Sequence, residues 1–170
     1  MTQPTLRERA IHEGIITALA VGGFLIIFGT VFGFTPGIPN KLIDFFSDFT
    51  GKSYPLNGGT LVLPAPAHPE QHLEVFGAVF NFMVGIALLQ IAILALRLFY
   101  HSPLRRISET VGNLVFWSGG ALVANIYLLS GTLKGWFAFW AALIILIGVS
   151  LVVRGIIHLS KARSRHERWW

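Results

Sequence analysis

The chain of 170 residues contains no cysteine and few charged residues. Without cysteine it can form no disulfide, and it has no thiolate to bind zinc or an iron–sulfur cluster or to act as a nucleophile. Charged residues make up 12% of the chain, against about 25% in a typical soluble domain. A surface that faces water throughout needs more charge than this, so the composition argues against a soluble globular protein.

The chain also lacks the common catalytic signatures. It contains no Gly-x-Ser-x-Gly, P-loop, His-Glu-x-x-His or Gly-x-Gly-x-x-Gly sequence. None of its eight acidic residues falls near the middle of a long apolar run, which weakens the case for a proton relay, a voltage sensor or an ion-coupled transporter. We therefore expect no catalytic residues and no cofactor, and an enzyme is the less favoured class.

Long apolar runs occupy most of the chain. Hydrophobic residues make up 54% of it, and its mean hydropathy is +0.65. Four uncharged runs have about the 20 residues that a helix needs to cross the hydrocarbon core of a bilayer. They predict membrane spans at about residues 14–34, 75–97, 110–130 and 135–157. The expected fold is an all-α integral membrane protein, a four-helix transmembrane bundle that forms a single membrane domain over residues 1–170.

Lysine and arginine are unevenly distributed over the segments that flank these spans. Ten lie on the side that holds both chain ends, and only Lys41, Lys52 and Lys134 lie on the other side. The positive-inside rule then predicts that both termini are cytoplasmic. The absence of cysteine and of Asn-x-Ser/Thr sequences favours a prokaryotic plasma membrane. The formal net charge of +5 is mostly this topology signal, and we expect no nucleic-acid partner.

The segment at residues 158–170 reads as a basic cytoplasmic tail. Basic side chains near a membrane surface attract anionic lipid head groups, and tryptophan favours the membrane interface. The tail is therefore expected to anchor the protein on lipid, or alternatively to dock on a partner. The residues expected to do so are Arg163, Arg165, Arg168, Trp169 and Trp170.

The external loop at residues 35–72 predicts a small cap over the bundle. Its first half has apolar residues at helical spacing from Ile38 onwards, with Pro39 suited to the first turn, and predicts an amphipathic helix that ends at Gly51. Its second half predicts a short β-hairpin over residues 54–63 that turns at Asn57-Gly58. An isolated hairpin is marginally stable in water, so the rest of the chain or another subunit must support it.

Imidazole and carboxylate side chains gather where this loop enters the second span. His68, His72 and Glu74 are the candidate ligands of a metal ion such as zinc or copper. However, His68 precedes a proline and so lies outside the helix, which prevents a regular i, i+4 pair of ligands. The favoured alternative is that these residues start the helix and hydrate the interface.

Small and amide residues at helical spacing predict where the spans pack. In the first span Ala18, Gly22, Gly29 and Gly33 share one face, and Gly29-x-x-x-Gly33 is a small-xxx-small pattern that lets helix backbones approach closely. The expected packing residues of the other spans are Asn81, Gly85, Gly112, Gly119 and Asn125. As an alternative, the amides of Asn81, Gln90, Asn113 and Asn125 line a narrow polar path.

The abundance of phenylalanine bears on function. The interior of so small a bundle cannot hold all fourteen phenylalanines, so some must face lipid or another protein. Together with the glycine seams and the missing catalytic motifs, this favours a non-catalytic accessory or scaffolding subunit of a larger membrane protein complex. Its partners would be the lipid bilayer and other integral membrane subunits or further copies of itself. Two alternatives stay open, a small oligomeric channel or carrier and a metal-binding membrane enzyme or redox subunit.

Overall fold

The computed structural model describes the backbone of residues 6–166 and the side chains of residues 11–53, 55 and 57–159. Within this range the chain forms five α-helices and one two-stranded antiparallel sheet. The helices are α1 (Leu6–Phe28), α2 (Ile38–Ser47), α3 (Leu73–Phe99), α4 (Leu104–Val123) and α5 (Leu133–His166), and the strands are β1 (Phe49–Leu56) and β2 (Gly59–Pro66). Short turns extend three of the helices: a π-helical turn η1 (Gly29–Gly33) follows α1, a 3₁₀ turn η2 (Pro69–His72) precedes α3, and a π-helical turn η3 (Ala124–Leu128) follows α4.

Four helical segments are long and apolar enough to cross a membrane. They are Ile11–Gly33, Pro69–Phe99, Leu104–Leu128 and Leu133–Leu159, with lengths of 23, 31, 25 and 27 residues. Each exceeds the roughly 20 residues that span the hydrocarbon core, and each contains most of a predicted span. The prediction of four apolar, membrane-spanning helices is therefore confirmed at the level of length and composition.

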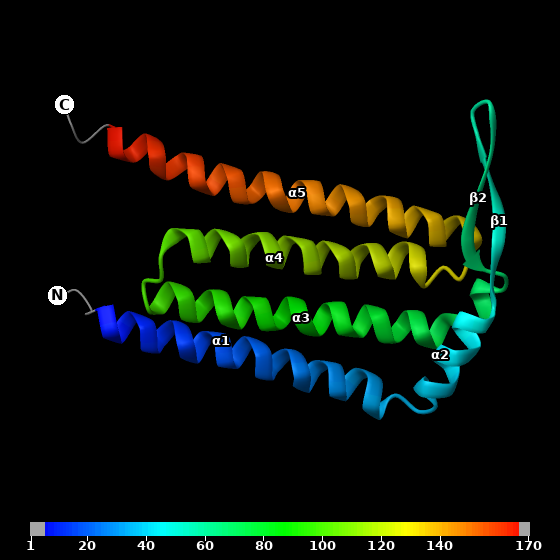
Figure 1. Ribbon diagram of the computed structural model, residues 1–170, viewed down its shortest axis with the longest axis horizontal. Coiled ribbons are helices and arrows are strands. Elements are labelled where there is room, and N and C mark those ends of the chain that lie inside the picture. Colours follow the sequence, from blue (N-terminus) through cyan, green and yellow to red (C-terminus); the bar gives the residue numbers. More distant parts are fainter. Residues whose placement is uncertain (1–5, 167–170) are drawn as a thin grey trace.

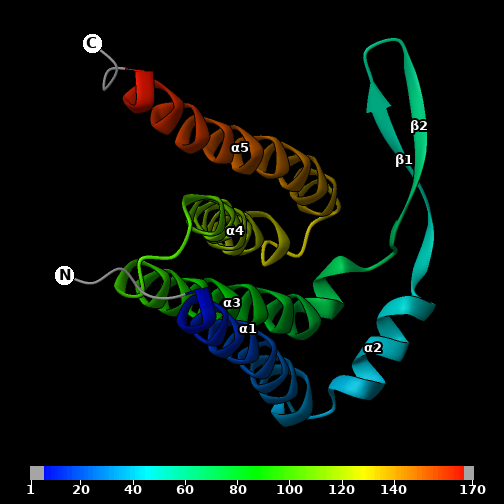
Figure 2. The same cartoon turned by 60° about the vertical axis from the view of Figure 1, so that its left-hand side comes forward.

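The four long helices lie side by side in the order α1, α3, α4, α5 (Figures 1 and 2). Each packs mainly on its neighbour in this row, so α1 and α5 form its two edges. The start of α1, the end of α5 and the α3–α4 connection lie at one end of the row, which we call the terminal end (Figure 1). The opposite end carries α2 and the hairpin, and we call it the cap end.

The cap consists of the predicted helix and hairpin, with different boundaries. Helix α2 starts as expected, with Pro39 in its first turn, but it ends at Ser47 and not at Gly51. The chain leaves the helix earlier because residues from Phe49 onwards pair with β2, where Gly51 lies opposite Pro64. Each strand is eight residues long, so the hairpin extends beyond residues 54–63.

The hairpin turns where the sequence predicts it. Leu56 pairs with Gly59, which leaves Asn57 and Gly58 as a two-residue loop. Gly58 has φ of +100°, a backbone conformation that glycine adopts without the steric cost that a side chain would bring. The tip of the hairpin points away from the helices, beyond the α5 edge of the row (Figure 1).

Buried aromatic side chains hold the cap on the helices. The ring of Phe45 in α2 lies edge-on to Phe76 of α3, with a centroid distance of 5.8 Å, and to Trp136 of α5, at 6.0 Å. All three are buried, as is Ala65 at the base of the hairpin. The base of the cap is thus fixed by aromatic packing to two different long apolar helices.

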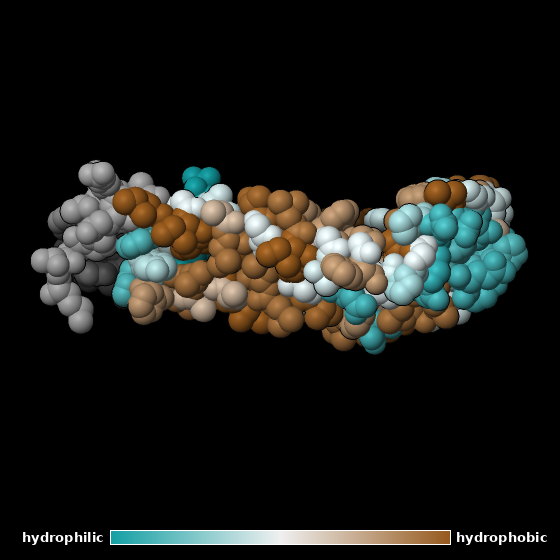
Figure 3. Space-filling view, turned by 90° about the horizontal axis from the view of Figure 1, so that it is seen from below, coloured by the Kyte–Doolittle hydropathy of each residue, from teal (hydrophilic) through white to brown (hydrophobic). Residues whose placement is uncertain are grey.

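The outer surface of the row is mainly apolar. Figure 3 shows hydrophobic residues along the middle of the molecule and hydrophilic residues at the cap end. Large exposed side chains include Leu25 and Ile26 of α1 and Ile144 and Ile145 of α5. In water such a surface would be costly, whereas lipid tails cover it at no such cost.

Candidate functional site

A carboxylate at the end of α2 contacts the segment that follows the hairpin and leads into α3. Asp48 accepts a hydrogen bond from the backbone N–H of His68 at 2.8 Å. Its two carboxylate oxygens also lie 3.0 Å from Nδ1 of His68 and 3.0 Å from Nε2 of His72. One aspartate therefore ties the start of the hairpin to the segment that leads into α3.

The environment of this carboxylate favours its charged form. Hydrogen bonds from the His68 side chain and backbone, and then from the His72 side chain, hold the pKa of Asp48 well below its usual range. The ring of His72 is itself buried and lies edge-on to Phe45, with a centroid distance of 5.2 Å. The ionised Asp48 is thus part of the structure that holds the cap in place.

Two of the three candidate metal ligands share a partner in the structure, and the third, Glu74, faces elsewhere. His68 and His72 both face Asp48, as described, whereas the carboxylate of Glu74 forms an ion pair with Lys41 of α2. Among the residues whose side chains are described, no group of three or more histidine, aspartate or glutamate side chains is arranged to hold a metal ion. The histidines point to the carboxylate of Asp48, a residue that the sequence pattern did not include.

Polar crevices lie on either side of the Lys41–Glu74 pair, between α2 and the start of α3. One, of about 430 Å³, is lined by Asp44, Glu70 and His72 among others. The other, of about 360 Å³, extends from Thr35 to Asn81. Asn81 lies seven residues beyond Glu74, so the second crevice reaches two helical turns along the α3 span.

An apolar hollow of about 530 Å³ lies on the other side of the cap, between α2, the hairpin and the start of α5. Its walls are aromatic or aliphatic throughout. They comprise Phe45, Phe46, Phe49, Leu63, Pro64, Trp136, Phe137 and Trp140. The cap thus has a polar side against α3 and an apolar side against α5.

Three of the predicted packing glycines meet a neighbouring helix closely. A Cβ at Gly85 of α3 would lie 2.7 Å from the side chain of Ile27 in α1. At Gly119 of α4 it would lie 2.5 Å from Leu146 of α5, and at Gly112 it would lie 2.2 Å from Nε of Arg154. At these positions the missing side chain leaves the space that a neighbouring helix fills.

The predicted seam of α1 is placed differently. Ala18 is exposed, and a Cβ at Gly22, Gly29 or Gly33 would meet no atom of the described residues within 4 Å. Helix α1 instead packs on α3 through Gly23, where a Cβ would lie 2.6 Å from Leu89. Successive residues point about 100° apart around a helix, so the stripe of small residues lies to the side of the α3 contact. Asn81 and Asn125 are also exposed.

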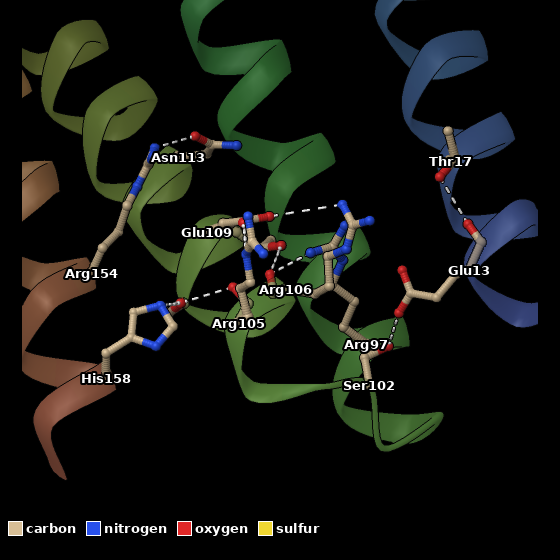
Figure 4. Close-up of polar contacts among 12 residues, drawn as sticks. Glu13, Thr17, Arg97, Ser102, Arg105, Arg106, Glu109, Asn113, Arg154 and His158 are labelled. Atoms are coloured by element: carbon tan, nitrogen blue, oxygen red, sulfur yellow. Dashed lines mark hydrogen bonds and ion pairs between the residues drawn. The ribbon is translucent and has the colours of Figure 1, made fainter. Parts of the chain in front are cut away.

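A polar network links three helices at the terminal end (Figure 4). Ser102 of the α3–α4 connection donates a hydrogen bond to Glu13 of α1 at 2.6 Å. The guanidinium group of Arg97 in α3 donates to the backbone carbonyl of Arg106 in α4. Arg105 and Glu109, one turn apart on α4, form an ion pair at 3.2 Å. These contacts connect α1, α3 and α4 near the ends of the long helices.

Two further polar contacts join α4 to α5 (Figure 4). Their residues lie inside the long apolar segments Leu104–Leu128 and Leu133–Leu159. Arg154 lays its side chain over Gly112 and donates to Oδ1 of Asn113 at 2.6 Å, while its buried Nε has no hydrogen-bond partner in the described part of the chain. One turn further, His158 lies 2.9 Å from the hydroxyl of Ser108. Sequence reasoning placed Arg154 among the flanking charges and missed this pairing, although its i, i+4 spacing from His158 was a signal for a shared polar face.

The side chains predicted to anchor the tail on lipid lie outside the described residues. Arg163 and Arg165 belong to the last turns of α5, but their side chains lie outside the described residues. Arg168, Trp169 and Trp170 lie outside the described residues altogether.

No protein-family model, no curated protein and no solved structure matches the chain.

Proposed function

We propose that this protein is a non-catalytic subunit of a larger membrane assembly and that α1 is its main contact with a neighbouring transmembrane helix. The observation that carries the proposal is the open stripe at Gly22, Gly29 and Gly33. A glycine that meets no other helix among the described residues leaves a groove suited to the backbone of another helix. Lipid tails gain nothing from such a close approach.

The burial of the four spans supports this choice. Within the most apolar window of each span, 6% of the α1 residues are buried, against 28% in the span that contains α4. Helix α1 lies at the edge of the row, and its large side chains Val21, Leu25 and Ile26 are more than half exposed. A partner helix laid along this edge would bury both the large side chains and the glycine groove.

The hairpin offers a second point of contact. Its base is buried under α5, but Leu61 and Val62 near the tip are 45% and 62% exposed. A projecting two-stranded hairpin is marginally stable alone, and a neighbouring subunit would provide the support that this chain does not give its tip. With the positive-inside rule, the proposed orientation puts both termini in the cytoplasm and the cap on the outer side.

The test is to purify the protein in mild detergent from its own membrane and to identify the intact assembly by native mass spectrometry. We expect a defined complex with other membrane subunits. The variant Gly29→Leu should release the protein from this complex, because leucine fills the proposed groove. A matched control is Gly148→Leu in α5, where a Cβ likewise meets no atom within 4 Å. A lone monomer in the parent sample, or equal release by both variants, would contradict the proposal.

A small channel or carrier is the second candidate, and the crevice that ends at Asn81 favours it. This crevice also exposes Lys41 and Glu74, so polar groups line a path from the cap into the α3 span. In liposomes that contain the purified protein, Asn81→Leu should abolish the leak of K⁺, Cl⁻ or glycerol without loss of folded protein. Asn125→Leu is the control, since Asn125 is exposed but lines neither crevice. A leak that survives Asn81→Leu would remove this candidate.

A further inference from the structure

The apolar hollow between α2, the hairpin and α5 is open to its surroundings. On its rim Phe46 is 69% exposed and Trp140 is 49% exposed. Deeper in, Trp136 directs its indole N–H to the backbone oxygen of Pro64 at 3.3 Å, so this donor is already used. The hollow therefore favours a hydrocarbon group over a polar one.

Its position relative to the long helices indicates which hydrocarbon can reach it. Trp136 and Trp140 lie within the first eight residues of α5, at the cap end of a span that runs to Leu159. Tryptophan near the end of a transmembrane helix is typical of the boundary between lipid tails and head groups. The hollow is thus placed where a lipid of the surrounding leaflet has its glycerol region and its upper acyl chain.

The charges around the cap are separated in a way that matches this position. Asp44, Glu70 and Glu74 line the polar crevice on the α3 side, and Asp48 faces the two histidines. Among the residues whose side chains are described, no carboxylate lines the hollow. Lys41 is paired with Glu74, and it lies with the carboxylates on the α3 side. This leaves two further lysines at the cap end, and neither of them forms an ion pair with the described residues.

These two lysines lie beside the hollow. Lys52 is directly opposite Leu63 in the β-ladder, so the two side chains share one face of the hairpin, and Leu63 lines the hollow. Lys134 precedes Phe137 by three residues and therefore lies on the same side of α5, one turn nearer the end of the helix. Two separate elements thus each place a lysine next to a residue that lines the apolar hollow.

We propose that this hollow binds one anionic phospholipid, with an acyl chain against the aromatic walls and the phosphate between Lys52 and Lys134. The apolar walls select a hydrocarbon chain, and the two unpaired ammonium groups select a negative head group over a zwitterionic one. A second copy of this chain is the less suitable occupant, because the rim of the hollow would then bring like charges together.

The proposal can be tested by quenching tryptophan fluorescence with lipids that carry bromine on the acyl chain. The reporter is a variant in which Trp117, Trp169 and Trp170 are replaced by phenylalanine, so that only Trp136 and Trp140 emit. Delipidated reporter protein is reconstituted in mixtures of brominated phosphatidylglycerol or brominated phosphatidylcholine with unlabelled lipid. We expect phosphatidylglycerol to quench at a clearly lower mole fraction than phosphatidylcholine.

Substitution of the lysines then locates the effect. Lys52→Gln and Lys134→Gln should each weaken the preference for phosphatidylglycerol about fivefold, and the double variant should remove it. Lys41→Gln is the matched control and should keep the preference, because Lys41 lies on the α3 side of the cap. All these side chains are at least partly exposed, so the variants should fold, which an unchanged thermal midpoint would verify.

Three results would overturn the proposal. They are equal quenching by the two lipids, a preference that survives the double lysine variant, and quenching that falls with protein concentration because a second copy covers the tryptophans. The experiment uses the isolated protein and leaves α1 unchanged. Its outcome is therefore independent of whether the chain assembles with partner subunits through the glycine groove.

Discussion

The segment formed by α1 and η1 carries several glycines, as α4 does, but the two use them differently. In α4 the space beside Gly112 and Gly119 is filled by side chains of α5, and the space beside Gly120 by Met83 of α3. In α1 and the turn η1 that follows it, only Gly23 is filled in this way by the described residues, while Gly14, Gly22, Gly29 and Gly33 stay open. The comparison teaches that a small-residue stripe marks a place for close helix approach, and that the sequence does not say which chain supplies the second helix.

The largest expected loss of stability comes from replacing a glycine whose neighbouring space is filled by another helix, compared with one whose neighbouring space is open. Gly112→Leu places a side chain where that of Arg154 lies and separates the arginine from Asn113. Overpacking of a close contact costs about 1–3 kcal/mol, and the displaced charge adds to this cost, so we expect a loss of about 3 kcal/mol of unfolding free energy. Denaturant titration of the purified protein in detergent measures it. The same replacement at the open Gly148 should change stability by less than about 0.5 kcal/mol, and equal losses would contradict the comparison.

A smaller effect is expected from two adjacent positions of α1. Gly23→Ala brings a methyl group within 2.6 Å of Leu89, so one side chain must move, and we expect a loss of about 1 kcal/mol. Gly22→Ala meets no atom, and it should be neutral or stabilise the isolated protein by up to about 1 kcal/mol, because alanine is the better helix former. The thermal midpoints of the two variants, measured side by side with that of the parent, test this difference. If both lose stability, α1 packs along the predicted face after all.

The smallest expected effect on stability comes from Asp48, which joins the end of α2 to the segment that leads into α3. Asp48→Asn removes the charge that accepts hydrogen bonds from His68 and His72, and we expect a modest drop in the thermal midpoint at pH 7. The lowered pKa of Asp48 stabilises the folded parent fully above the unfolded pKa of about 4, and this contribution is lost as the pH falls. Between pH 5 and pH 3 only the unfolded parent takes up the proton at this site. The parent should therefore lose stability faster than the variant over this range, and parallel losses would show that Asp48 does not hold the cap.

The features of the fold that could be predicted from the sequence are those that depend on residues close together in the chain. The spans follow from runs of apolar residues, and the turn at Asn57-Gly58 follows from the need for a positive φ in a two-residue loop. The start of α2 follows from Pro39. Its end at Ser47 could not be predicted in the same way, because strand pairing with β2 takes over the chain from Phe49.

The candidate sites were predictable only in part. The gathering of His68 and His72 was visible in the sequence, but their common partner Asp48 lies at least 20 residues away and comes from the other side of the hairpin. The pairing of Arg154 with Asn113 likewise joins residues that are 41 positions apart. Contacts between distant residues depend on how the helices are placed next to one another, which no local pattern reveals.

The sequence by itself determined that this is a chain of four membrane-length apolar helices with a helix-and-hairpin cap, because hydrophobic length and turn chemistry are properties of neighbouring residues. Only the tertiary structure decided that the helices form a row, that α1 leaves its glycine stripe open, and that the cap has a polar side and an apolar side. These features depend on the rotation of each helix about its own axis. That rotation is set by packing against another helix, where a shift of one residue turns the contact face by about 100°.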